Sequence, residues 1–374
     1  MNKYALNWVE ISKSALLHNL DQFIKYTGKK AQICPILKAN AYGHGMIETA
    51  KIIQNKPIWG FGVVNLSEAL LLVQNRVKKP ILVLSYADND INLGLKNKIE
   101  FSVYSLKFAQ ALDKAAARLK TKARVHLKVE VGTNRLGVRP EKLFSFVREI
   151  KKLKNIDLKG IFSHLADSEN KNWNFTNQQI NLFNRLLNDL KEEGITIPLR
   201  HLACSAAASS PLTHYNLVRL GLSLYGLWPS LSAKKKYAGK INLRPVLSWH
   251  AKIIQIKEVK KGEGIGYGAS CEAKKKLKIA IIPVGYFEGY DRKLSNKNFV
   301  LIKGRRCRVL GRVCMNMHMV DVSRLPGVKA GDKVTLIGCQ NKKEIKVEDL
   351  AENIQTINYE VVSRINSLIP RIYV

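Results

Sequence analysis

The chain has 374 residues, of which 46% are hydrophobic and 24% are charged, and this globular composition excludes a disordered or collagen-like chain. The formal net charge of +33 suggests an acidic partner such as nucleic acid, an anionic membrane or a phosphorylated ligand. The densest basic runs, 234–236, 274–276 and 305–308, lack the interleaved aromatic residues of single-strand binders. We therefore predict no nucleic-acid partner, and a basic nucleic-acid-binding protein remains the alternative from a different functional class.

The cysteines and the hydropathy pattern bear on metals, membranes and location. The six cysteines form no Cys-x-x-Cys pair, so we predict neither a zinc ribbon nor any other metal site. The N-terminus does not resemble a signal peptide, and no apolar stretch approaches the roughly 20 residues that span a bilayer. We predict a cytoplasmic protein with reduced thiols and no membrane partner.

Short apolar runs alternate with amphipathic segments as far as Gly226. Ser12 is expected to cap one helix, and Arg139-Pro140 to open another. The apolar runs cover 32–37, 58–64, 81–84, 100–103, 125–131, 158–164, 201–204 and 217–225. Their alternation with helices predicts parallel strands, and eight runs fit a (β/α)₈ barrel. An open doubly wound sheet is less favoured because no Gly-x-Gly-x-x-Gly follows the first run.

The pattern changes after about residue 239, where short strands separated by turns predict a mostly-β C-terminal domain. Strands are expected over 246–257, 277–284, 299–302, 307–319 and 333–337, and a helix over 356–368. We predict three parts: an N-terminal strand (1–9) that joins the C-terminal domain, a barrel (10–238) that binds a cofactor, and the β-rich domain (239–374).

Several residues with reactive side chains follow the apolar runs, where barrels place their active sites. Lys38 closes the first run, and burial there would lower its pKa and free the neutral amine that a Schiff base requires. Lys128 in the fifth run and Arg135 just after it are two cations that need a nearby anion. Ser205 follows the seventh run and Gly221 lies in the eighth, and the loops after these two strands are the usual phosphate-binding position of a barrel.

Motifs spread over the whole chain resemble those of the alanine racemase family, pyridoxal-phosphate enzymes of fold type III. In the barrel they are KANAYGHG (38–45), GTNRLG (132–137), HLACSAA (201–207) and VRLGLSLYG (218–226). In the β-rich domain they are GYG (266–268), GYFEGY (285–290), GRVCM (311–315) and TINYE (356–360). The resemblance implies a homodimer with shared active sites that interconverts L-alanine and D-alanine for peptidoglycan synthesis. A racemase of broader amino-acid specificity is the alternative.

The resemblance also implies a role for individual residues. Lys38, and Tyr267 from the partner subunit, would be the two bases that act on a pyridoxal-phosphate aldimine. The implied cofactor contacts are Lys38, Tyr42, His164, Ser205, Arg219, Gly221, Leu222 and Tyr359. The implied substrate contacts are Arg135 and Met315, the entrance residues are Tyr286 and Arg292, and Lys128 matches a lysine that many members carry as a carbamate.

Several positions depart from the family pattern, and three of them remove or replace a polar group near this site. Phe162 stands where tyrosine is frequent, which removes a hydroxyl that would orient Lys128. Cys204 replaces an asparagine beside Ser205, and Asn316 replaces an aspartate. The implied bases are unchanged, so these differences bear on rate and substrate preference rather than on the type of reaction.

Overall fold

The computed structural model describes residues 5–374, which form two compact units. The barrel unit comprises Leu16–Ala41 and Met46–Arg244. The β unit comprises the segment that ends at Ala15, the short stretch Tyr42–Gly45, and Pro245–Val374. Residues 1–4 of the predicted N-terminal strand lie outside the described residues.

The barrel unit is built on parallel strands. They are β2 (Gln32–Pro35), β3 (Phe61–Asn65), β4 (Ile81–Tyr86), β5 (Glu100–Val103), β6 (Ala123–Lys128), β7 (Ile156–Phe162), β8 (Leu199–His201) and β9 (Leu217–Leu220). Strands β3 to β8 pair in chain order, and β2 pairs with β9. A bridge between Ile36 and Gly62 joins β2 to β3, and the Arg219 amide donates to the Ala203 carbonyl (3.1 Å) beyond β8. The sheet therefore curls into a barrel-like ring, and the predicted fold class is confirmed.

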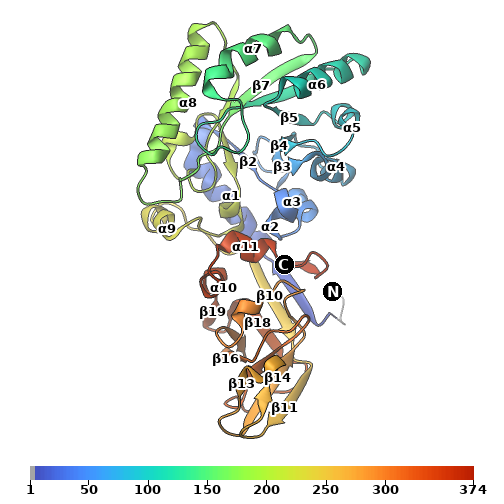
Figure 1. Cartoon of the computed structure of the whole chain (residues 1–374), viewed down its shortest axis with the longest axis vertical. Coiled ribbons are helices and arrows are strands. Elements are labelled where there is room, and N and C mark those ends of the chain that lie inside the picture. The colour runs from blue at the N-terminus through green and yellow to red at the C-terminus, as the bar shows by residue number, and fades with distance from the viewer. Residues whose placement is uncertain (1–4) are drawn as a thin grey trace. The chain divides into compact units, whose positions relative to one another are not determined.

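Helices follow the strands and cover their outer side, as α4 to α8 do in Figure 1. They are α1 (Lys13–Thr27), α3 (Met46–Ile53), α4 (Leu66–Gln74), α5 (Ile91–Lys96), α6 (Leu106–Arg118), α7 (Leu143–Lys152), α8 (Asn174–Glu192) and α9 (Leu231–Tyr237). The Ser12 hydroxyl accepts from the Ala15 amide (3.2 Å), as an N-cap does. Pro140 opens a 3₁₀ turn before α7, whose inward residues Leu143, Phe146, Val147 and Ile150 are all buried.

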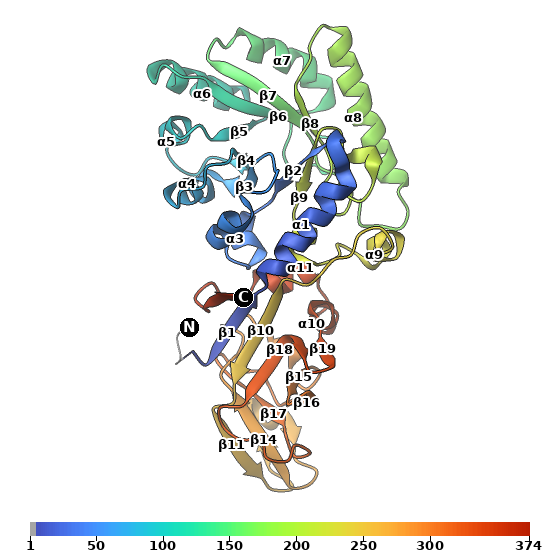
Figure 2. The same cartoon turned by 180° about the vertical axis from the view of Figure 1, so that it is seen from behind.

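The β unit contains one large sheet in the order β11-β14-β17-β16-β15-β18-β10-β1-β20. Its strands are β1 (Asn7–Ile11), β10 (Leu247–Lys252), β11 (Gln255–Val259), β14 (Leu277–Ile282), β15 (Phe299–Ile302), β16 (Arg305–Leu310), β17 (His318–Asp321), β18 (Lys333–Gln340) and β20 (Arg371–Tyr373). Figure 2 shows β1 beside β10, although the two are far apart in the sequence. The shorter strands are β12 (Gly264–Ile265), β13 (Cys271–Glu272) and β19 (Lys343–Ile345).

Three predicted elements of the β unit are wrong in extent. The strand predicted over 246–257 is two strands, because β10 ends at Lys252 and pairs with β18, whereas β11 begins at Gln255 and pairs with β14. The strand predicted over 307–319 is two strands, because Gly311 has φ 72° and the Cys314 amide closes a turn on the Met317 carbonyl (2.9 Å). The helix predicted over 356–368 is only α11 (Asn358–Ser363), which follows α10 (Val347–Ile354). Beyond α11 the Asn366 amide bonds to the Glu288 carbonyl (3.1 Å), so the helical hydrogen-bond pattern stops.

Candidate active site

The predicted site residues fall into two groups, one in each unit. The barrel unit holds Lys38, Lys128, Arg135, His164, Ser205, Arg219, Gly221 and Leu222. The β unit holds Tyr42, Tyr267, Tyr286, Arg292, Met315 and Tyr359. In both groups, residues distant in sequence are brought together by the fold.

A strained turn follows Lys38. The short helical segment α2 (Lys38–Tyr42) has left-handed backbone angles at Ala39, Asn40 and Ala41, with φ of 53°, 52° and 54°. Such angles cost free energy in residues with a Cβ atom, and they persist only where surrounding contacts impose them. Here the Glu68 carboxylate accepts from the Ala39 amide (2.7 Å), and the Asn40 side chain accepts from the Met46 amide (2.8 Å). These bonds hold the backbone that carries Lys38.

The electrostatic surroundings of Lys38 favour its neutral form. The side chain reaches solvent at the end of its strand, yet the surrounding protein withdraws enough water to lower the pKa of the amine. The Arg135 guanidinium lowers this pKa further by repulsion, while Glu68 opposes the shift. A lysine in this setting gives up its proton more readily than one in water.

The loop that carries Arg135 is organised by Glu130. The Glu130 carboxylate accepts from the amides of Gly132 (2.6 Å), Thr133 (2.6 Å) and Arg135 (3.1 Å). These bonds hold the pKa of the Glu130 carboxyl below its usual range against the opposing effect of burial. The Glu130 carboxylate therefore orders the loop through these hydrogen bonds, and the ordered loop fixes the position of Arg135.

Lys128, at the end of β6, is a buried amine among cations. Its Nζ donates to the Leu84 carbonyl (3.3 Å) and lies 5.4 Å from the centre of the Phe162 ring. The Arg219 guanidinium lies 5.3 Å from the same ring, so one aromatic side chain accommodates both positive groups. Burial, followed by repulsion from Arg219 and Arg135, lowers the pKa of Lys128 to about 8.

Arg219, on β9, is buried and almost fully bonded. Its Nη1 donates to the His201 carbonyl (2.8 Å) and to His201 Nδ1 (2.9 Å). Its Nη2 donates to the carbonyls of Ser163 (2.7 Å) and Leu202 (3.1 Å), with His164 Nδ1 at 3.5 Å. The Nε–H has no acceptor among residues 5–374. Burial lowers the pKa of Arg219 to about 10, so the guanidinium is charged at neutral pH. Its Nε–H is the donor that remains for a ligand.

A buried chain of hydrogen bonds extends from Arg219 to Glu100. His201 Nε2 lies 2.9 Å from His126 Nδ1, and His126 Nε2 lies 2.8 Å from Glu100 Oε2. The guanidinium can only donate and a carboxylate can only accept, so both histidines are neutral with the proton on Nε2. Burial and the charge of Arg219 also hold the pKa of His201 well below its usual value. Glu100 thereby sets the orientation of His201, which in turn orients Arg219.

Ser205 and the start of the 3₁₀ helix η4 (Leu222–Tyr225) form a small polar recess. The Ser205 hydroxyl accepts from the amides of Gly221 (2.8 Å) and Ser223 (3.3 Å). The amide of Leu222 stands at the N-terminal end of η4, where amides lack an intrahelical acceptor. A hydroxyl and a helix N-terminus together suit an anion.

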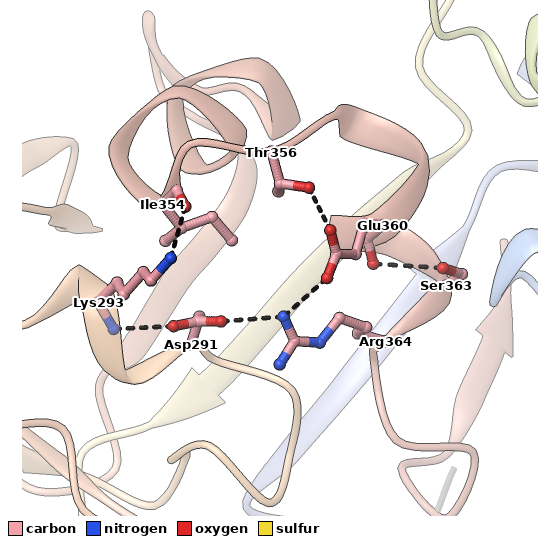
Figure 3. Close-up of polar contacts among 7 residues, drawn as sticks. All are labelled: Asp291, Lys293, Ile354, Thr356, Glu360, Ser363 and Arg364. Carbon is pink, nitrogen blue, oxygen red and sulfur yellow. Dashed lines mark hydrogen bonds and ion pairs between the residues drawn. The ribbon is translucent and has the colours of Figure 1, made fainter.

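In the β unit, Tyr42 and Tyr359 approach each other, with ring centres 6.2 Å apart and planes tilted by 48°. Tyr359 lies on α11, which a polar network holds in place (Figure 3). The Arg364 guanidinium contacts Asp291 (2.9 Å) and Glu360 (3.1 Å), and the Thr356 hydroxyl donates to Glu360. The same Asp291 accepts from the Lys293 amide (2.8 Å), so the turn that carries Arg292 and the helix that carries Tyr359 are braced together.

The remaining predicted residues of the β unit lie on exposed loops. Tyr267 is 70% exposed between Gly266 (φ 74°) and Gly268 (φ 66°). Met315 and Tyr286 are also exposed, and their loops are joined where the Tyr286 amide donates to the Cys314 carbonyl (3.1 Å) and the Phe287 amide to the Met315 carbonyl (2.9 Å). Gly285 allows this approach, because a Cβ atom there would stand 2.2 Å from the Cys314 oxygen.

Sequence reasoning missed Glu100, His126 and His201 as parts of the site. All three lie within or at the end of predicted strands, so the sequence did contain a signal, since charged and imidazole groups in buried strands need partners. Their partners are far away in the sequence, and only the curled sheet brings them together. Phe162 was noted for its missing hydroxyl; its ring also stacks on His201, with centres 4.7 Å apart and planes at 7°.

Comparisons with known proteins decide the family. The chain matches the model of the alanine racemase N-terminal domain over residues 11–229 and that of the C-terminal domain over residues 246–373. The chain belongs to the alanine racemase family. This is a family of pyridoxal-phosphate-dependent amino-acid racemases. Separately, no helix among the described residues is long and apolar enough to cross a membrane.

Members of the alanine racemase family match the chain over nearly its full length. The alanine racemase of Methanococcus maripaludis is 39% identical over 369 residues, 98% of each protein, and that of Desulforamulus reducens is 38% identical over 370 residues, again 98% of each. The solved alanine racemase of Clostridium difficile 630 has a TM-score of 0.92 at 35% identity, covering 99% of this chain and 96% of that one. A histidine racemase from Leuconostoc mesenteroides has a TM-score of 0.88 at 28% identity, covering 100% and 99%. The same fold therefore occurs in racemases named for different amino acids.

Proposed function

We propose that this protein is an alanine racemase that interconverts L-alanine and D-alanine with pyridoxal phosphate. The observation that carries the proposal is Arg219, a buried and charged guanidinium with four bonded N–H groups and an Nε–H without an acceptor in the described chain. An aromatic ring nitrogen is a suitable acceptor for that donor. Relatives named alanine racemase, at 38–39% identity, support alanine as the substrate.

The residues present fit the cofactor. Lys38 would carry it covalently, and its lowered pKa supports that role. Ser205 and the amides of Gly221 and Leu222 would bind the phosphate, together with the Tyr42 and Tyr359 hydroxyls. His164 would lie near the ring as a neutral imidazole, because burial and the charge of Arg219 hold its pKa well below the usual value.

When bound, pyridoxal phosphate supplies a conjugated ring that takes up the electron pair left at the substrate α-carbon. Arg219 would donate from Nε and keep its own proton, so the ring nitrogen stays unprotonated and the ring is a weaker electron acceptor. The Lys38 amine, with its lowered pKa, would remove or return the α-proton on one face of the substrate. Arg135, fixed by the Glu130 loop, would bind the substrate carboxylate.

Inversion requires a second base on the opposite face, and we assign it to Tyr267 of the partner subunit. The exposure of Tyr267 supports this assignment, since a tyrosine at 70% exposure is available to a partner. Other large apolar side chains of the β unit are also exposed, and such a group typically marks an interface. They are Tyr286, Phe287, Met315, Met317 and Ile357. We therefore infer a homodimer with shared active sites, in which Met315 contacts substrate and Tyr286 and Arg292 line the entrance.

Lys128 is proposed to carry a carbamate. A pKa of about 8 leaves a substantial neutral fraction, and only a neutral amine adds carbon dioxide. The product would be an anion beside Arg219 and Arg135, which removes the repulsion among three cations. We further place the enzyme in the cytoplasm, where D-alanine would enter peptidoglycan synthesis.

The test is proton exchange in deuterated water, with L-alanine, D-alanine and L-histidine as separate substrates. We expect the yellow, cofactor-loaded protein to convert L-alanine to D-alanine with loss of the α-proton signal. Lys38→Ala should lose the borohydride-reducible chromophore, and Tyr267→Phe should retain exchange from one enantiomer while inversion fails. Absence of α-deuterium incorporation by loaded protein would refute racemisation, and faster inversion of histidine would refute alanine as the substrate.

A further inference from the structure

A basic hollow of about 710 Å³ lies in the β unit, made entirely from residues of that unit. It is formed by the turn after β13, by β15 and β16, by the segment that follows β17, and by β19. Its cationic lining residues are Lys275, Arg305, Arg306, Arg308, Arg324 and Lys343. Two of the densest basic runs of the sequence, 274–276 and 305–308, thus contribute to one concave surface.

The positive charge of this hollow is not neutralised by the chain. Its only acidic lining residue is Asp321, whose Oδ1 accepts from the Ser323 amide (2.8 Å). Within the part of the chain that the structure describes, none of the six cations lies within 4.0 Å of a carboxylate. Like charges gathered without a counter-ion repel one another, so a bound anion would stabilise the arrangement.

Two of the arginines are oriented without losing their charge. Arg308 donates from Nη2 to the Asn296 carbonyl (2.8 Å), and Arg306 donates from Nη2 to the Glu344 carbonyl (3.3 Å). Carbonyl acceptors hold a guanidinium in place while leaving other N–H groups available. Phe299 stands directly opposite Arg308 in the β15–β16 pair and is partly exposed, so it adds an aromatic face to the lining.

We propose that this hollow binds a short oligophosphate: an inorganic polyphosphate or the triphosphate group of a nucleotide. Arginine forks match phosphate oxygens, and several linked phosphates are needed to meet six cations. The volume lies in the range of small-ligand sites, roughly 300–1,000 Å³, which favours a compact anion over a long polymer. The site is separate from the residues assigned to racemisation.

The experiment measures equilibrium binding of three probes to the whole protein: inorganic tripolyphosphate, ATP and a 12-nucleotide deoxythymidine strand. The test variant combines Arg305→Ser, Arg324→Ser and Lys343→Ser, three exposed cations whose side chains make no hydrogen bond to the described chain. The control combines Lys234→Ser, Lys235→Ser and Lys240→Ser, which removes the same charge from exposed positions of the barrel unit. Sedimentation and alanine racemisation are measured for both variants to show that fold and assembly are intact.

We expect saturable tripolyphosphate binding that falls about tenfold or more in the test variant and is unchanged in the control. Equal affinities for tripolyphosphate and ATP would identify the phosphate chain as the ligand. Tighter ATP binding that Phe299→Ser abolishes would identify a nucleotide. An equal loss in both triple variants, binding of the oligonucleotide alone, or no binding at low salt would overturn the proposal.

Discussion

The buried contact between His126 and Glu100 leads to a sharp stability prediction. His126 is fully buried and Glu100 is 5% exposed, and the His126 Nε2–H donates to Glu100 Oε2 over 2.8 Å. In Glu100→Leu this donor loses its acceptor and cannot reach water. A buried donor without a partner costs about 1–3 kcal/mol, so we expect the barrel unit to lose about 2 kcal/mol.

Glu100→Gln separates the hydrogen bond from the charge. Glutamine keeps an oxygen that can accept from His126, so only the charge assistance is lost. Hydrogen bonds to charged groups contribute about 1.5–3 kcal/mol and neutral ones about 0.5–1.5 kcal/mol, so the expected loss is about 1 kcal/mol. The order of stability should be parent, then Glu100→Gln, then Glu100→Leu.

Urea unfolding followed by circular dichroism measures these differences. With a slope of about 2 kcal/mol per molar urea, Glu100→Leu should lower the midpoint of the barrel unit by about 1 M. Glu193→Gln is the control, because its ion pair with Arg148 is largely exposed and should contribute less than about 1 kcal/mol. A Glu100→Leu midpoint equal to that of the parent, or above that of Glu100→Gln, would refute the hydrogen-bond chain as a stabilising element.

Two further predictions concern Lys128 and Gly285. The pKa of Lys128 is about 8 in the folded chain and near 10.4 when unfolded, so the unfolded chain binds more protons between these values and stability should rise with pH across that window. Lys128→Met should flatten the rise, by about 2 kcal/mol, when unfolding is measured at pH 7.5 and 9.5 in buffer free of carbon dioxide; an unchanged pH dependence would contradict the shift. Gly285→Ala would place a Cβ atom 2.2 Å from the Cys314 oxygen and should lower the stability of the β unit by about 2 kcal/mol or more in thermal unfolding. Gly239→Ala, with nothing within 4 Å of the added carbon, is the neutral control, and equal effects of the two changes would contradict the packing argument.

The order of the elements was predictable from sequence because it depends on local pattern. The run 100–103 is β5 and the run 299–302 is β15, since apolar β-branched and aromatic residues there alternate with clear turn signals. The prediction failed where remote contacts end an element. The strand after Cys307 breaks at Gly311, and the helix after Thr356 ends when backbone amides find partners outside it.

The site residues divide in the same way. Lys38, Arg219 and Tyr267 could be proposed from sequence because each lies in a continuous motif that resembles one of the alanine racemase family. The histidine chain was not, because His126 and His201 lie 75 residues apart and Glu100 is 26 residues from His126. This chain of hydrogen bonds joins residues from three strands, so it forms only when the sheet curls.

The net charge of +33 also shows what the sequence alone can and cannot determine. The sequence alone determined that +33 exists, that its basic runs lack a nucleic-acid motif, and that the chain has the family's motifs in order. Only the tertiary structure decided where the charges meet: Lys128 and Arg219 around one ring, and two basic runs around one hollow. Sequence patterns reflect the conformational preferences of residues that are adjacent in the chain. Repulsion and hydrogen bonding instead depend on distances between side chains that only folding creates.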